Sequence, residues 1–441
     1  MTSLIQPKIL KGFRDFLPEA EIKRALLTEK LTAAFRSYGF VPIDTPVLEY
    51  AEILLRKSDG ETEKQVFRFT DNGGRDVALR FDLTVPFARF IAEHKDELYF
   101  PFKRYHIAKV WRGEKPQAGR YREFVQCDFD IVGSDSAAAD FEILALIRHA
   151  LLCIDVKNIT IRISHRGLFN IFLANLDLDE KSEDILRAVD KLSKIGTDKV
   201  HALLDDITLD NAKTETVLNY ICGARNFDDT LSLMEQSAGT EGSGAVKRLK
   251  EIRTFIRDNG MEDVIVLDPS ITRGLDYYTG LVYETFLNDL PSIGSVCSGG
   301  RYDNLTGLYM KEKISGAGAS IGLDRLIAAL DELGESSVQK GFLDAEIFCT
   351  DENAMHSYQK TAFALRKTGL AVEVFPEAKK MNQQYAAAEK KAVPFGIFID
   401  KTQAADNLLT LKNLQTRELH ENITVEKAFY IIAEHKIGTK E

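Results

Sequence analysis

The chain has 441 residues, of which 44% are hydrophobic and 28% charged, and its formal net charge is −10 at pH 7. This length is enough for two or three domains with full cores, and the composition is typical of a soluble globular protein. The acidic balance argues against a protein coated in positive charge for non-specific nucleic-acid binding, but it leaves room for a local basic site.

The five cysteines are scattered and form no CxxC pair, which argues against structural zinc and against a disulfide framework. The first residues contain no apolar segment typical of a secretory signal, and no apolar run approaches membrane-spanning length. We therefore expect a cytoplasmic protein that has no membrane partner.

The first predicted helix begins at Pro18 and runs to about Tyr38, where Gly39 ends it. Residues 39–50 (GFVPIDTPVLEY) are expected to form a strand. Pro42 and Pro46 interrupt that strand, which favours an edge or interface position because proline cannot donate to a strand ladder.

Residues 65–71 and 76–87 flank an Asn-Gly-Gly turn and are predicted to form a hairpin. In the second strand, apolar residues alternate with Arg80, Asp82 and Thr84, which would share one face. From the pattern alone, this face is either an ordinary solvated face or part of a polar cleft.

Residues 103–133 are predicted to form a second hairpin, with a loop at 113–119 that contains glycine and proline. Its second strand places Gln126, Asp128 and Asp130 on the face opposite the core. Glu114 is the one acid among seven basic residues, which are Lys103, Arg104, Lys109, Arg112, Lys115, Arg120 and Arg122. This pattern fits two interpretations. One is an ordinary hairpin with a solvent-exposed face, and the other is a site that binds phosphates together with a cationic or imidazole-bearing ligand.

Beyond a helix at 136–152 and a strand at 158–163, residues 172–260 are acidic and helical in pattern, and we interpret them as a helical insertion. A strand at 263–267 follows. RGLDYYTGLVYETF (273–286) contains a further strand, and SVCSGGRYDNL (295–305) suggests a Gly-Gly turn. GAGASIGLDRL is expected to be a strand entering a helix, with glycines that let a ligand or a neighbouring strand approach closely.

A domain boundary is expected near residues 331–343, which are polar and unpatterned. The remainder alternates between strand and helix signals, which predicts a small mixed α/β domain. This part is nearly neutral, while the rest of the chain carries most of the negative charge. It is therefore the better candidate for nucleic-acid contact.

Several of these stretches together resemble the histidyl-tRNA synthetase family of class II aminoacyl-tRNA synthetases. GFVPIDTPVLEY resembles class II motif 1, FKRYHIAKVWRGEKPQAGRYREFVQCDFDIVG resembles motif 2, and GAGASIGLDRL resembles motif 3. RGLDYYTG and SGGRYDNL resemble the two signature stretches of the histidine enzyme. KGFRDFLP and RFDLTVPF match as well, so the resemblance covers the whole chain.

The resemblance implies an α+β fold: a class II catalytic core on an antiparallel sheet (1–330), with the helical insertion (172–260) inside it. A C-terminal anticodon-binding α/β domain (343–441) would follow. It also implies a homodimer formed through the motif 1 region. The implied reaction activates L-histidine with ATP, accompanied by Mg²⁺, and transfers the histidyl group to the 3′ end of tRNA(His).

By the same resemblance, Arg112 would hold the α-phosphate of ATP and Arg325 the γ-phosphate, with Glu114 near the adenine. Arg273 would lie beside the histidine carboxylate and the α-phosphate, which makes Arg112 and Arg273 the candidate catalytic residues. Guanidinium groups suit these positions because they stay charged and pair with phosphate oxygens in bidentate fashion. No protein metal ligand is implied.

For the amino acid, Asp82 and Thr84, with Leu83 between them, and Gln126 would receive the α-ammonium group. Asp130 and Tyr278 would bind the imidazole, which offers one donor and one acceptor when neutral. The remaining histidine contacts implied are Arg112, Arg273, Tyr277 and Tyr302. Some relatives carry a glutamate-glycine pair in place of Asp82-Leu83 and a glutamate in place of Asp130.

Other residues keep a structural interpretation beside the functional one. Arg120 and Arg122 fit salt bridges as well as tRNA contacts, and Tyr277 fits core support. Asp128 is expected to support the site from behind, and His106 and His165 to be structural, because a substrate carboxylate needs no base at neutral pH. The competing function is a non-catalytic relative that acts as a regulatory subunit or senses uncharged tRNA.

Overall fold

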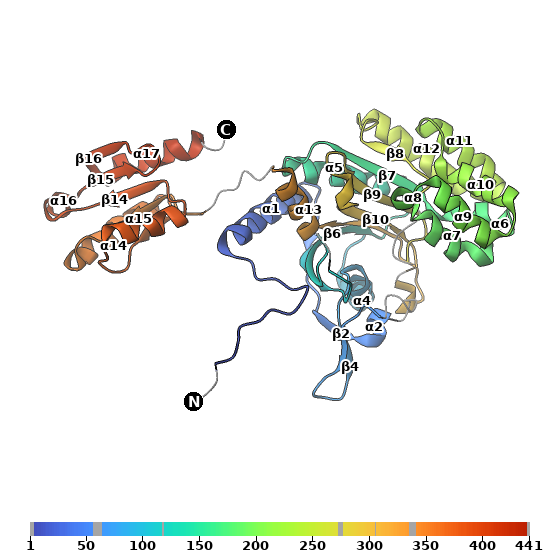
Figure 1. Ribbon diagram of the computed structural model, residues 1–441, viewed down its shortest axis with the longest axis horizontal. Helices are drawn as coiled ribbons and strands as arrows, with labels where there is room; N and C mark the ends of the chain where they lie inside the picture. Colours follow the sequence, from blue (N-terminus) through green and yellow to red (C-terminus); the bar gives the residue numbers. More distant parts are fainter. Residues whose placement is uncertain are drawn as a thin grey trace. The chain divides into compact units, whose positions relative to one another are not determined.

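The computed structural model describes residues 4–55, 64–116, 119–271, 277–304, 306–334 and 341–438 (Figure 1). Contacts divide the chain into two compact units. One comprises Met1–Asp15 and Leu26–Ser336, and the other comprises Phe16–Ala25 and Ser337–Glu441. The first unit is built on a large sheet and a small one, the second on a single sheet, and each unit has its own main apolar cluster.

An eight-stranded sheet forms the centre of the first unit, in the order β1-β5-β6-β11-β10-β9-β7-β8. Its strands are β1 Val41–Pro42, β5 Phe102–Trp111, β6 Glu123–Val132, β7 Ile159–His165, β8 Ile265–Leu267, β9 Leu281–Leu287, β10 Cys297–Tyr302 and β11 Gly316–Gly322. The six strands from β5 to β7 in this order pair antiparallel, and only the β1–β5 and β7–β8 pairs are parallel. The predicted antiparallel core is confirmed.

The β5–β6 hairpin is the longest pairing in the sheet, and its register places Arg104 opposite Asp130 and His106 opposite Asp128. The apolar residues between these pairs face α1 (Pro18–Ser37), α5 (Ala137–Cys153) and the rest of the main core. On that side, Phe35 of α1 packs against Phe129 with their ring centroids 4.9 Å apart. The other face of the hairpin is left for polar groups.

The structure corrects two predictions in the N-terminal third. Residues 39–50 do not form one interrupted strand: β1 is an edge strand of the large sheet, whereas β2 (Leu48–Tyr50) belongs to a three-stranded sheet of order β2-β4-β3. The strand predicted over 76–87 ends early, because β4 spans Asp76–Leu79 and α4 spans Thr84–His94. β3 spans Arg68–Thr70, and α2 (Ala51–Leu55) follows β2.

A helical region lies between β7 and β8, in agreement with the expected helical character (green to yellow in Figure 1). Its helices are α6 Arg166–Ala174, α7 Ser182–Val189, α8 Leu192–Ile195, α9 Thr197–Thr208, α10 Asn211–Cys222, α11 Phe227–Ala238 and α12 Ser243–Asp258. Their apolar faces belong to the same cluster as the sheet. Buried Asp140 of α5 binds Arg248 of α12 at 2.8 Å and Arg301 of β10 at 2.8 Å.

The glycine pair predicted to form a turn instead lies inside β10. A Cβ at Gly299 would come within 2.2 Å of the carbonyl oxygen of Gly318 on β11, and one at Gly300 within 2.8 Å of the Tyr278 ring. These glycines therefore permit close packing across the sheet. As predicted, β11 enters a helix, α13 (Leu323–Leu333).

The second unit carries a mixed five-stranded sheet of order β13-β12-β14-β15-β16. Its strands are β12 Ala345–Ile347, β13 Val372–Val374, β14 Phe395–Phe398, β15 Leu408–Asn413 and β16 Leu419–Thr424, and its helices are α14 Met355–Lys367, α15 Met381–Lys390, α16 Lys401–Asp406 and α17 Val425–Gly438. α16 and β16 were not predicted from the sequence. A capping box of Asp400 and Gln403 starts α16, a signal that was present in the sequence.

Among the described residues, every helix is too short or too polar to cross a membrane.

Candidate active site

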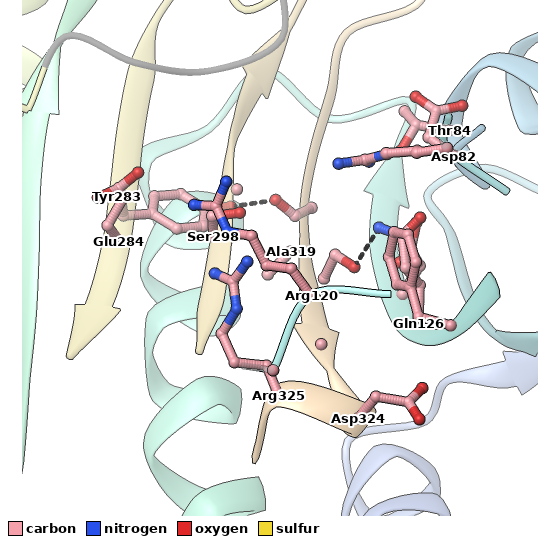
Figure 2. A pocket seen from close by; sticks show the side chains of 18 of the residues that line it. Asp82, Thr84, Arg120, Gln126, Tyr283, Glu284, Ser298, Ala319, Asp324 and Arg325 are labelled. Atoms are coloured by element: carbon pink, nitrogen blue, oxygen red, sulfur yellow. Dashed lines mark hydrogen bonds between the residues drawn. The ribbon is translucent and has the colours of Figure 1, made fainter. Parts of the chain in front are cut away.

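A cavity of about 370 Å³ opens on the polar face of the large sheet (Figure 2). Side chains from β6, β9, β10 and β11 form its floor, while the ends of the β5–β6 hairpin and the start of α4 form its walls. The polar residues lining it are Asp82, Thr84, Arg112, Glu114, Arg120, Tyr121, Gln126, Asp128, Asp130, Tyr277, Tyr278, Tyr283, Glu284, Ser298, Ser320, Asp324 and Arg325.

Three arginines make one part of this cavity strongly positive. Arg112 follows β5 and donates from Nε to the carbonyl oxygen of Phe81 at 2.9 Å, and Arg325 in the first turn of α13 donates to the carbonyl oxygen of Ser295 at 2.6 Å. The side chain of Arg120 extends beside that of Arg325 in Figure 2. Burial, followed by the charges of Arg120 and Arg112, lowers the pKa of Arg325. Such a concentration of guanidinium groups is suited to an anion with several oxygens.

The loop between β5 and β6 is braced from both ends. Arg122 Nε donates to the carbonyl oxygen of Glu114 at 3.1 Å, and the backbone N–H of Arg122 donates to the carbonyl oxygen of Gly12 at 2.9 Å. Arg120 lies 3.9 Å from the Glu114 carboxylate and lines the cavity. Arg122 is thus a structural brace, whereas Arg120 is available to a ligand.

Asp82 begins the negative part of the cavity and has 1% of its surface exposed. It accepts hydrogen bonds from the Val85 N–H at 3.1 Å and from the Tyr277 hydroxyl at 3.3 Å. Burial raises the pKa of Asp82 to about 6, against the opposing effects of the Val85 N–H and Arg112. Thr84 follows as the first residue of α4. A buried carboxylate with few partners is a good receptor for a cationic group.

Asp128 and Asp130 continue the negative part along β6. Asp130 accepts a hydrogen bond from the Tyr302 hydroxyl at 2.6 Å and forms an ion pair with Arg104 at 2.7 Å. Burial raises the pKa of Asp130 even though Arg104 opposes the shift. Burial also raises the pKa of Asp128 to about 7, with Arg104 4.0 Å away. Both carboxylates are therefore poorly solvated, and a hydrogen-bond donor of a ligand in the cavity would stabilise their ionised form.

Aromatic and amide groups complete the negative end. The rings of Tyr277 and Tyr278 meet edge-on with their centroids 4.9 Å apart. Gln126 donates from Nε2 to the Ser320 hydroxyl at 2.7 Å (Figure 2), which leaves its Oε1 without a hydrogen-bond partner among the described residues. This oxygen is a free acceptor on the cavity wall.

The structure brings most of the predicted site residues into one cavity. Those that line it are Asp82, Thr84, Arg112, Glu114, Gln126, Asp130, Tyr277, Tyr278 and Arg325. Tyr302 does not line the cavity itself among the described residues, but its hydroxyl contacts Asp130, which does. Leu83 is buried, and its carbonyl oxygen lies 3.4 Å from Arg104 Nη2. Arg273 lies outside the described residues.

A polar row formed by strand pairing was predicted from the sequence only at its first member, Asp128. Ser320 lies opposite Asp128 of β6 on one side and opposite Ser298 of β10 on the other, and Ser298 lies opposite Glu284 of β9. Each of these residues occupies an unremarkable position in its own strand. Asp128 was placed on a polar face by its own strand, but only the pairing of β6, β11, β10 and β9 brings the other three beside it, so no local signal marked Ser320, Ser298 or Glu284.

The two histidines that were expected to be structural lie in strands of the large sheet and are not among the described residues that line the cavity. His106 is buried and its Nε2 lies 2.9 Å from Asp44 Oδ1, while burial and the charges of Arg104 and Arg80 lower its pKa to about 3. His165 accepts the Leu168 N–H at the start of α6, and burial lowers its pKa to about 4. Both rings are neutral near pH 7.

Comparison with known proteins shows the family to which both parts of the chain are similar. A family model described as "Histidyl-tRNA synthetase" matches residues 12–326, and one described as "Anticodon binding domain" matches residues 337–435. A curated relative from Treponema denticola, named histidine–tRNA ligase, is 61% identical over 92% of this chain and 92% of its own length. Another of that name, from Rhodopirellula baltica, is 46% identical over 94% of this chain and 95% of its own length.

Among solved structures, the histidyl-tRNA synthetase of Nostoc sp. PCC 7120 superposes with a TM-score of 0.86 at 30% identity, covering 98% of this chain and all of the other. The match thus extends over both compact units of the chain. With the family model, the curated relatives and the class II core in agreement, the chain belongs to the histidyl-tRNA synthetase family.

Proposed function

We propose that this protein is a histidine–tRNA ligase whose cavity forms histidyl-adenylate from L-histidine and ATP. The histidyl group then passes to the 3′ end of tRNA(His). The observation that carries the proposal is the polarity of the cavity, in which Arg112, Arg120 and Arg325 face the buried carboxylates of Asp82, Asp128 and Asp130. A triphosphate fits the first group, and the ammonium and imidazole of histidine fit the second.

At the positive end, Arg112 binds the α-phosphate of ATP and Arg325 the γ-phosphate, with Glu114 near the adenine. Arg120 is a further phosphate ligand, because its guanidinium lies beside that of Arg325. Arg273 is assigned to the histidine carboxylate and the α-phosphate from the sequence resemblance alone. Fixed guanidinium groups would offset the negative charge that grows at the α-phosphate in the transition state.

At the negative end, Asp82, Thr84 and Gln126 receive the α-ammonium group, with Leu83 holding the segment in place. Asp130 accepts the imidazole N–H, and the Tyr278 hydroxyl donates to the other ring nitrogen. Tyr277 and Tyr302 hold Asp82 and Asp130 through their hydroxyls. A neutral imidazole is satisfied at both nitrogens by this pair, so a side chain lacking either nitrogen would leave a buried group unpaired.

In the first step, a carboxylate oxygen of histidine attacks the α-phosphorus of ATP, and the bond to the bridging oxygen breaks to release pyrophosphate. The carboxylate is already ionised at neutral pH, so this step needs no general base. In the second step, a ribose hydroxyl of tRNA attacks the carbonyl carbon, and AMP leaves. The buried floor of the cavity excludes water from the mixed anhydride in between.

We propose Mg²⁺ as the companion of ATP. Among the described residues, groups of three or more metal-binding side chains are absent, so a cage made only of protein does not fit. Mg²⁺ commonly needs just one or two carboxylates in addition to phosphate oxygens, and Glu284 on the cavity wall fits that requirement. When bound, the ion would offset charge on the phosphates.

The chain divides its work between two domains and acts as a dimer. Residues 1–330 are the catalytic core with an insertion at 172–260, and residues 343–441 read the anticodon, supported by the family match to 337–435. A cytoplasmic homodimer forms through the motif 1 region, where Val47, Leu48 and Tyr50 are exposed apolar residues. Analytical ultracentrifugation of wild type and Tyr50→Glu tests the dimer.

Amino-acid-dependent ATP–pyrophosphate exchange tests the adenylation site. We expect exchange with histidine alone among the amino acids, with large losses in Arg325→Ala and Arg273→Ala. Arg187→Ala is the matched control, because Arg187 is an exposed arginine of α7 outside the cavity. If the folded protein binds histidine but catalyses no pyrophosphate exchange, the proposal is overturned and the non-catalytic alternative is favoured.

A further inference from the structure

Arg104, in the middle of β5, is fully buried behind the cavity. Its guanidinium lies 2.7 Å from Asp130 and 4.0 Å from Asp128, and it stacks over the Phe87 ring at 4.2 Å. Arg104 is not among the described residues that line the cavity. It therefore contacts site residues without being positioned to contact a ligand.

The same side chain connects the two ends of the amino-acid site. Arg104 Nη2 donates to the carbonyl oxygen of Leu83 at 3.4 Å, between Asp82 and Thr84 at the ammonium end. It also pairs with Asp130 at the imidazole end. One rigid guanidinium thus contacts the segments that would hold opposite ends of histidine.

Stability alone does not explain this arginine. Its Nε and Nη1 have no hydrogen-bond partner among the described residues, so part of its desolvation cost is not recovered. A buried ion pair with unsatisfied groups often contributes little to folding, and apolar side chains of similar volume can replace it at no loss. A role in the site accounts for this cost.

The charges around Arg104 indicate what that role is. Asp128 and Asp130 are two buried carboxylates on one face of β6, and Arg104 is the cation closest to both. The other ionisable groups beside them are Tyr302, Tyr278, Tyr277, Tyr283, Asp82, Cys297, Arg80 and His106. His106 is neutral near pH 7, and Arg80 is the other cation among these groups, interacting with Asp128. Without Arg104, the two carboxylates would share a proton, because like charges in a buried site cannot both be ionised.

We propose that Arg104 is a positioning residue for histidine recognition, which holds Asp130 ionised and aimed into the cavity while fixing the Leu83 backbone at the ammonium end. This inference rests on the proposed function. It predicts that the loss of Arg104 weakens histidine binding selectively and leaves ATP binding, at the other end of the cavity, nearly unchanged.

ATP–pyrophosphate exchange is measured for wild type, Arg104→Met, Arg104→Lys and the double variant Arg104→Met/Asp128→Asn. We expect the KM for histidine to rise about tenfold or more in Arg104→Met, with the KM for ATP within about twofold of wild type. The double variant should recover much of this loss, because Asp130 then keeps its charge without a buried carboxylate beside it. A purely structural role would not produce such a rescue.

The lysine variant keeps the positive charge, but one ammonium cannot contact Asp130 and Leu83 while stacking on Phe87. We expect an intermediate KM for histidine, and this variant decides the question if Arg104→Met does not fold. Arg301→Met is the matched control: Arg301 is equally buried, but it binds Asp140 on the opposite face of the sheet. That variant should lose thermal stability without a selective change in the KM for histidine.

Two results would overturn the inference while leaving the proposed function intact. One is a wild-type KM for histidine in the folded Arg104 variants. The other is a parallel rise in the KM values for histidine and ATP with no rescue in the double variant. If wild type itself shows no histidine-dependent exchange, the proposed function fails instead.

Discussion

Asp130 of β6 lies directly opposite Gly318 of β11, and a Cβ atom at residue 318 would come within 2.0 Å of Asp130 Oδ1. The glycine leaves the space that this carboxylate occupies. The prediction that glycines in 316–322 permit close approach is confirmed here, and the approaching group is a side chain of the proposed histidine site.

Gly318→Ala should therefore displace Asp130. We expect the KM for histidine in pyrophosphate exchange to rise by about 10- to 100-fold, because small misplacements of a binding group cost that much. Gly244→Ala is the control, since a Cβ there has no atom within 4 Å. An unchanged KM for histidine in Gly318→Ala would show that Asp130 is not an imidazole ligand.

Tyr302→Phe removes the hydroxyl that donates to Asp130 at 2.6 Å. A hydrogen bond to a charged group contributes about 1.5–3 kcal/mol, so the KM for histidine should rise by roughly 10- to 100-fold. Tyr220→Phe is a matched control, because the buried Tyr220 hydroxyl has no hydrogen-bond partner among the described residues. Equal effects of the two substitutions would contradict the role given to Tyr302.

Asp82→Asn should stabilise the fold at neutral pH while weakening histidine binding. Burial raises the pKa of Asp82 from 3.8 to about 6, so wild type loses stability as the pH rises through this range and the buried carboxyl ionises. Above pH 6, the variant should gain on the order of 2–3 kcal/mol in its free energy of unfolding, whereas below about pH 4 the two proteins should match.

Urea unfolding of both proteins at pH 4, 6 and 8 measures this difference, and isothermal titration at pH 8 measures the affinity for histidine. A stability difference that does not change with pH would mean that Asp82 is ionised throughout. An unchanged affinity would remove Asp82 from the ammonium site.

A chain ending at residue 334 should still activate histidine but should charge tRNA poorly. The apolar cluster of residues 345–432 shares no member with the main core, so the main core should form without it. We expect pyrophosphate exchange within about threefold of wild type, because the cavity residues all precede residue 334. Aminoacylation should fall by about 100-fold or more with the loss of a second tRNA contact. Loss of exchange in a folded truncated protein would contradict this division.

Much of the site could be predicted from the sequence because its polar residues alternate with core residues along β6. Alternation was misleading at 76–87, where Asp82 and Thr84 lie at the start of α4 and not on a strand. A helix signal was present there: Asp82 accepts the Val85 N–H, and Pro86 lies in the first turn, where a missing N–H costs nothing. Over such a short stretch, the spacing of apolar residues fits both the period of a helix and that of a strand.

Ser320, Ser298 and Glu284, and the contact of Arg104 with Asp130, could not be predicted in the same way. In the sequence, Arg104 is one of seven basic residues, and its register opposite Asp130 makes it different from the other six. The position of Arg104 depends on hairpin geometry, and the polar row depends on the pairing of β6 with β11, which lie far apart in the sequence. Neither is encoded in any local pattern.

The helices between β7 and β8 share one apolar cluster with the large sheet. Their slowest amide hydrogens should therefore exchange with solvent through the same global opening as those of the strands. Histidine binds the folded protein and so stabilises it against global unfolding. It should therefore slow amide exchange in α10 and α12, although no described residue of either helix lines the cavity. A ligand bound in the cavity would in this way be detected throughout the helical region.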